Sequence, residues 1–139
     1  TAKYPSLFRA AAPISTNLGS GFQDQPPIYY AACPTAPVPI LLAHGTADPK
    51  LPINGKTNAE GELIEASFDQ ERTRWLVTNA CDAPGDVSDD PMFSTEDFDA
   101  CASGASVRVV TVEGMAHVWP DADEPWNANQ QVMDFFLAQ

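Results

Sequence analysis

The feature that most constrains the fold is the apolar run from Val38 to Ala43, which ends in the turn-rich stretch "HGTADPKLP". A strand with one face in water alternates apolar and polar residues. A run that is apolar throughout is typical of a strand covered on both faces, as in a parallel sheet. Val107 to Val112 is a second predicted strand. Two such strands in separate parts of the chain favour a sheet with crossover connections.

Helices are predicted after each of these strands. Ser67 and Gln70 form a capping box that begins a helix over Ser67–Ala80, and Asn127 and Gln130 offer a second one near the C-terminus. The apolar face of the second helix comprises Val132, Met133, Phe135 and Phe136. The order strand, helix, strand, helix predicts an α/β fold with parallel strands and crossover helices.

The other segments give weaker patterns. Lys3–Ala12 resembles the tail of a helix, followed by a short apolar strand in "FRAAAPI", and Ser15–Pro37 has the composition of a surface excursion. Leu51–Ile64 favours a hairpin, and Asp82–Gly104 an acidic loop. No internal repeat or linker divides the chain, which predicts one domain.

Composition excludes several partners. Of 139 residues, 44% are hydrophobic, enough for a packed core, and 7 basic against 19 acidic residues give a net charge of -12. Such a surface repels nucleic-acid phosphates and anionic lipids, and no apolar run approaches the roughly 18 residues of a membrane span. The three cysteines form no C-x-x-C pair, which argues against a zinc clip and leaves every pairing among them open.

Two side chains are candidates for chemistry. Asp48 and His117 each lie about five residues beyond a predicted strand, where α/β sheets gather functional groups. A carboxylate that accepts from Nδ1–H fixes the imidazole tautomer and leaves Nε2 free to act as a general base on a hydroxyl. Gly114 permits a sharp swing before the histidine, and Trp119 provides an aromatic wall.

Plainer interpretations apply to the same residues. A histidine in a loop is commonly a solvated or core residue, and an aspartate before proline commonly forms a turn. His44, at the end of the first strand, is expected to pack or to bond backbone near Asp48. A metal site would have only Asp48 and His117 as ligands, and the acidic groups lack the calcium-loop pattern, so no metal is predicted.

The stretches "HGTADPKLP" and "EGMAHVWPD" together resemble the carboxyl half of an α/β-hydrolase, in particular the secreted esterases grouped with polyhydroxybutyrate depolymerases and feruloyl or acetylxylan esterases. That family's acid loop has the form H-G-T-x-D-x-x-V-P, with Leu51 here in the valine place. "YPSLFRAAAPIS" and "TRWLVTNACDAPGD" are similar to further segments of the family. The resemblance implies that residues 1–139 are the C-terminal half of a single catalytic domain.

The same resemblance implies a secreted serine carboxylesterase that needs no cofactor. Asp48 would orient His117, and Trp119 would line the substrate site. Cys81 and Cys101 would pair. The implied substrates are esters, including feruloylated or acetylated plant polysaccharide and polyhydroxyalkanoate.

Two departures from the family pattern shape the expectation. Met115 and Ala116 replace glycines before the histidine, which predicts an altered loop or added bulk in the pocket. No G-x-S-x-G occurs, and Ser20, although it lies between glycines, has no strand and helix around it. The nucleophile is therefore expected in an N-terminal half, in cis or as a separate chain, where Cys33 would also find a partner if it is not a buried thiol. The alternative is a non-catalytic hydrolase-fold binding or assembly subunit, or an inactive remnant.

Overall fold

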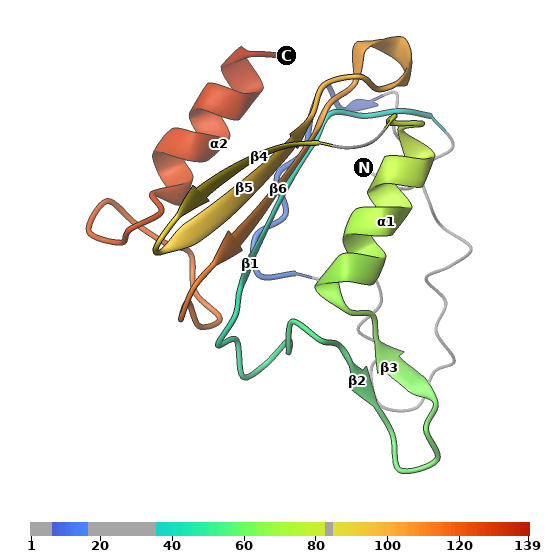
Figure 1. Ribbon diagram of the computed structural model, residues 1–139, viewed down its shortest axis with the longest axis vertical. Helices are drawn as coiled ribbons and strands as arrows, with labels where there is room; N and C mark the ends of the chain where they lie inside the picture. Colours follow the sequence, from blue (N-terminus) through green and yellow to red (C-terminus); the bar gives the residue numbers. More distant parts are fainter. Residues whose placement is uncertain (1–6, 17–35, 83–84) are drawn as a thin grey trace.

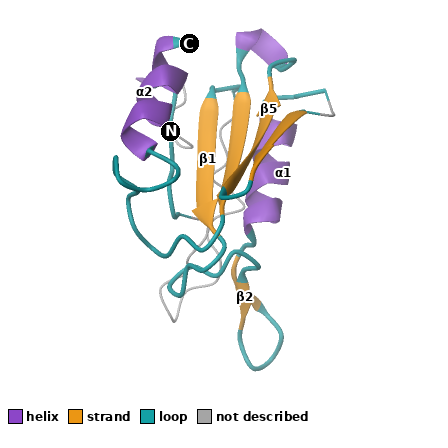
Figure 2. Ribbon diagram, turned by 60° about the vertical axis from the view of Figure 1, so that its left-hand side comes forward, coloured by secondary structure: helices purple, strands orange, loops and turns teal. Residues whose placement is uncertain are grey.

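The computed structural model describes residues 7–16, 36–82 and 85–139, which form a mixed sheet with a helix on each face (Figures 1 and 2). The strand order in the sheet is β1-β6-β5-β4, and a two-stranded ribbon, β2-β3, lies outside it. The elements are β1 (Ile40–Gly45), β2 (Lys56–Thr57), β3 (Leu63–Glu65), α1 (Phe68–Thr78), β4 (Asp86–Asp90), β5 (Phe93–Phe98), the short 3₁₀ helix η3 (Ala102–Gly104), β6 (Val107–Val112) and α2 (Ala128–Leu137). The predicted α/β class is confirmed.

The apolar run becomes β1, at one end of the strand order, and every residue of this strand is buried. It pairs in parallel with β6. Leu41 and Ala43 pack in the cluster that includes α2, whereas Ile40 and Leu42 pack in the cluster that includes α1. Both faces of β1 are therefore covered, which is why its sequence shows no alternation.

Local capping sets where each helix begins. Ser67 and Gln70 make the reciprocal capping box at α1, as predicted. At α2, the Asn127 side chain accepts from the Gln130 backbone N–H, but the Gln130 side chain donates to Asp134 instead of returning to the cap. The second capping box is therefore only half formed.

The prediction of an acidic loop over Asp82–Gly104 is wrong, because this segment holds the antiparallel hairpin β4–β5, which extends the sheet beyond β6. All five residues of the edge strand β4 are exposed, so no apolar alternation marks it. A charged, exposed edge strand also resists pairing with other chains. The sheet is consequently mixed rather than purely parallel.

Two arginines fix this acidic hairpin to the rest of the fold. Arg72 of α1 makes two hydrogen bonds of 2.7 Å to the Glu96 carboxylate, and Arg108 of β6 donates to Asp97 at 2.6 Å. Both pairs are partly buried and fork-shaped, the geometry in which guanidinium–carboxylate pairs are strongest. The hairpin thus depends on charge pairing where apolar contacts are few.

The remaining predictions have mixed outcomes. The apolar segment "FRAAAPI" is not a full strand, but Ala11 and Ile14 form parallel bridges to Ile40 and Ala43. The hairpin predicted within Leu51–Ile64 is present as β2–β3. The described part of the predicted N-terminal helix tail, residues 7–12, contains no α-helix, so that prediction is wrong there. Residues 3–6 of the tail and residues 17–35 of the surface excursion, with Ser20 and Cys33, lie outside the described residues.

Cys81 and Cys101 form a disulfide that closes the loop containing β4 and β5. Closing a loop of this length lowers the conformational entropy of the unfolded chain, which stabilises the folded state by roughly 3 kcal/mol. We expect the double variant Cys81→Ala/Cys101→Ala to lose about that much unfolding free energy, measured by urea denaturation. A reducing agent should lower the midpoint of the parent protein and leave the double variant unchanged. Equal midpoints for parent and variant would show that the disulfide is energetically neutral.

Candidate active site

The ends of β1 and β6 bring Asp48 and His117 together, although 69 positions separate them in the chain. The Nδ1 atom of His117 lies 2.9 Å from Oδ2 of Asp48. The two strands are parallel neighbours, so the loops that follow them leave the sheet side by side (Figure 1). The predicted juxtaposition is confirmed.

The two oxygens of Asp48 have separate partners. Oδ1 accepts hydrogen bonds from the backbone N–H groups of Lys50 and Leu51, both at 2.9 Å, while Oδ2 faces His117. Asp48 is therefore both a turn former and an imidazole partner. Burial alone would raise the pKa of its carboxyl, but the hydrogen bonds from Leu51, His117 and Lys50 outweigh burial and lower the pKa below 3.8. The carboxylate stays ionised at neutral pH.

Three hydrogen bonds join the acid loop to the histidine loop. Thr46 donates its backbone N–H to the carbonyl of Val112 at 3.0 Å, and its hydroxyl accepts from the N–H of Gly114 at 2.8 Å. The N–H of Ala47 donates to the carbonyl of Met115 at 3.2 Å. These bonds fix the separation of the two loops without any contribution from the side chains of Asp48 and His117.

Gly45 is required for this close approach. A Cβ built at this position would overlap the carbonyl of Met115, so no other residue fits without moving the histidine loop. Gly114 adopts a φ of +70°, as its position before the histidine predicts. The Met115 side chain is buried in the apolar core beside α2, so it adds no bulk to the site. The importance of Gly45 and Thr46 was not predicted, because it depends on a contact between distant loops.

Trp119 provides an exposed aromatic surface two residues after His117. About half of its surface is accessible, and so is that of Val118. The indole N–H donates to the side-chain oxygen of Asn129 in α2 at 3.0 Å, which fixes the ring against the first turn of the helix. The structure therefore shows a held aromatic side chain on the histidine loop; its contact with substrate remains a prediction.

His44 has the structural position expected of it. It is buried at the end of β1, and its Nε2 lies 2.8 Å from the carbonyl oxygen of Leu51. The ring stacks at a tilt on Phe68, the first residue of α1, with a centroid distance of 5.3 Å. His44 thus bonds the backbone of the acid loop close to Asp48.

Ser15 also lies near the histidine loop. It follows the bridge between Ile14 and Ala43, has a φ of +47°, and is buried. Its hydroxyl donates to the carbonyl of Val118 at 3.5 Å, so within the described residues it bonds to backbone rather than to the imidazole of His117. The feature that draws attention to Ser15 is its positive φ, which is unusual for a non-glycine residue and cannot be inferred from the sequence.

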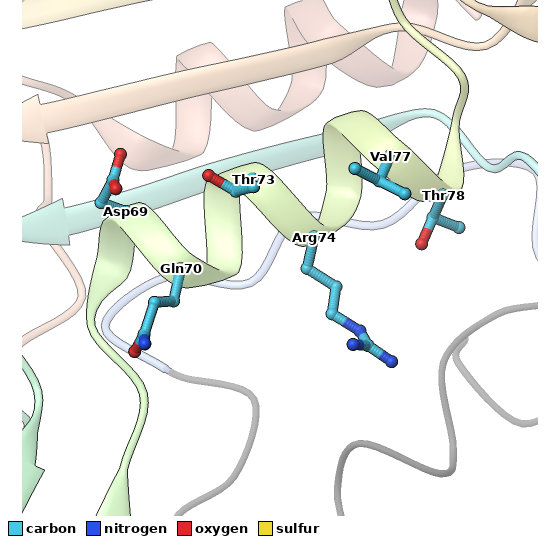
Figure 3. Close-up of a pocket in the computed structure, with 6 residues that line it drawn as sticks. All are labelled: Asp69, Gln70, Thr73, Arg74, Val77 and Thr78. Carbon is cyan, nitrogen blue, oxygen red and sulfur yellow. The ribbon is translucent and has the colours of Figure 1, made fainter. Parts of the chain in front are cut away.

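A hollow of about 470 Å³ lies along α1, and neither Asp48 nor His117 is among its lining residues (Figure 3). It is lined by Asp69, Gln70, Thr73, Arg74, Val77 and Thr78. Within residues 7–16, 36–82 and 85–139, no three potential metal-ligating side chains converge. Nor does any helix in those ranges have the length and apolar character to cross a membrane.

Comparison with known proteins does not identify the chain: it matches no protein-family model, and no curated protein matches it.

Proposed function

We propose that this chain contributes the aspartate and the histidine of a Ser-His-Asp triad in a secreted serine carboxylesterase of the α/β-hydrolase type. The observation that carries the proposal is the 2.9 Å contact between Oδ2 of the buried, ionised Asp48 and Nδ1 of His117. The mixed α/β sheet and the loops at its strand ends are consistent with that fold. The nucleophilic serine is proposed to come from outside this chain, in cis or as a separate polypeptide.

The chemistry follows from the direction of the imidazole. Because Nδ1 donates to Asp48, Nε2 carries a lone pair and accepts the proton of the serine hydroxyl as its oxygen attacks the ester carbonyl. The imidazolium so formed is stabilised by the ionised carboxylate. It then returns the proton to the departing alcohol, and the same cycle with water releases the acid and the free serine.

The proposed substrates are neutral esters, including polymeric ones such as feruloylated or acetylated plant polysaccharide and polyhydroxyalkanoate. The surface charge of -12 disfavours anionic substrates. The exposed, held ring of Trp119 offers an apolar surface for the acyl or the alcohol side. The Cys81–Cys101 disulfide is typical of proteins in oxidising compartments, which supports the proposal of secretion.

A fluorophosphonate probe tests the proposal in the intact, folded protein. We expect covalent labelling of a serine outside this 139-residue chain, at a rate that falls sharply in the matched variant His117→Ala. Peptide mapping locates the label. Ser15 serves as an internal check, because labelling there would contradict the assignment of the nucleophile to another part of the protein.

Absence of labelling in a folded sample would overturn the esterase proposal. It would favour instead the non-catalytic binding or assembly subunit that the missing G-x-S-x-G motif raises as the second candidate.

A further inference from the structure

We propose that His44 is a positioning residue that acts through Asp48, which goes beyond the two-residue pair and rests on the proposed function for its catalytic consequence. His44 lies four positions before Asp48, and its Nε2 is 3.8 Å from Oδ2. This is the same oxygen that faces Nδ1 of His117 at 2.9 Å. One carboxylate oxygen therefore lies within 4 Å of the ring nitrogens of two histidines.

The hydrogen bond of His44 fixes its tautomer. A backbone carbonyl can only accept, so the 2.8 Å contact with the oxygen of Leu51 places the ring proton of His44 on Nε2. Nδ1 then carries the lone pair, and it is buried with no hydrogen-bond partner among the described residues. The polar N–H edge thus points toward the acid loop, and its positive end lies close to the carboxylate.

The peptide group of Leu51 links His44 to Asp48. Its carbonyl accepts from His44, and its N–H donates to Oδ1 of Asp48 at 2.9 Å. Loss of the imidazole would free the carbonyl and loosen the turn from 48 to 51. Because the backbone N–H groups of that turn bind Oδ1, the carboxylate would also be less firmly oriented, and Oδ2 would face His117 less consistently.

The surroundings of His44 make it rigid enough to serve this purpose. The residue is 1% exposed, and its ring lies against Phe68. A side chain that is held by packing transmits its position to its partner, whereas a mobile one does not. The structure therefore shows a buried, packed imidazole next to the carboxylate that faces His117.

The experiment compares His44→Gln with His44→Asn. The side-chain nitrogen of glutamine is as many bonds from Cα as Nε2 of histidine, so it can donate to Leu51, whereas that of asparagine is too short. The first readout is the ¹⁵N spectrum of the imidazoles, which reports the tautomers directly. The chain contains two histidines, so difference spectra against His117→Ala and His44→Gln assign both.

We expect His44 to carry its proton on Nε2 and His117 on Nδ1 in the parent protein. The His117 tautomer should persist in His44→Gln and become mixed in His44→Asn. In the ester-hydrolysis assay, kcat should fall by up to about 10²-fold in His44→Asn with little change in KM, and glutamine should restore most of it.

The tautomer measurement and the ester-hydrolysis assay can each contradict a different proposal. Equal His117 tautomer populations in the parent, His44→Gln and His44→Asn proteins would overturn the positioning role, as would an equal loss in both variants. If the tautomers respond as expected while no variant or parent protein hydrolyses esters, the positioning role stands and the proposed esterase function fails.

Discussion

Asp48→Asn is expected to lower kcat for ester hydrolysis by about 10⁴-fold, the loss known when the orienting aspartate of a triad becomes an amide. The structure gives the reason. Lys50 and Leu51 donate backbone N–H groups to Oδ1, so the amide oxygen of asparagine will occupy that place. Its NH₂ group then faces Nδ1 of His117, which must accept. The ring proton moves to Nε2, where it blocks the uptake of the serine proton.

Hydrolysis of p-nitrophenyl acetate by the intact protein measures this effect. His117→Ala should lose a similar amount, and the double variant should lose little more, because residues that act as one unit are not additive. Asp123→Asn, an exposed change on the same loop as His117, is the matched control and should retain the parent rate. Near-parental rates for Asp48→Asn would remove the pair from the mechanism.

The parts of the fold that the sequence predicts are those set by local patterns. The unbroken apolar run of β1 requires cover on both faces, and the capping box at Ser67 depends on residues three apart. The Asp48–His117 contact was predictable for a similar reason. Each residue follows a strand of a parallel pair, and that topology alone brings the two loops to one edge.

What the sequence could not predict depends on contacts between distant segments. The strand β4 has no apolar face, and it is a strand because β5 pairs with it and because Arg72 and Arg108 hold β5 by its carboxylates. Gly45 matters only because Met115 passes directly over it. Neither the pairing of β4 with β5 nor the contact between Gly45 and Met115 produces a periodic pattern of residues in the sequence.

A buried carboxyl group outside the site also escaped prediction. Glu71 lies in the first half of α1, and it resembles an ordinary exposed helical residue in sequence. In the structure it is 3% exposed, and its Oε2 has no hydrogen-bond partner in the part of the chain that the structure describes. Burial raises the pKa of Glu71 to about 8, so the side chain is largely protonated in the folded protein at neutral pH.

This raised pKa makes stability depend on pH in a defined direction. The folded state binds one proton more than the unfolded state between about 4.5 and about 8. The free energy of unfolding contributed by Glu71 is therefore fully present below 4.5 and is lost as the pH rises toward 8. The expected slope is about 1.4 kcal/mol per pH unit within that window.

Glu71→Gln should remove this dependence, because the amide is nearly the same shape and does not titrate. We expect urea denaturation at pH 5 to give similar unfolding free energies for parent and variant, and at pH 8.5 to show the variant more stable by on the order of 4 kcal/mol. Glu60→Gln, at an exposed position, should follow the parent at both pH values. Parallel pH profiles for the parent and Glu71→Gln would mean that the folded state accommodates the charged carboxylate. Ionisable groups common to both proteins cancel in the comparison.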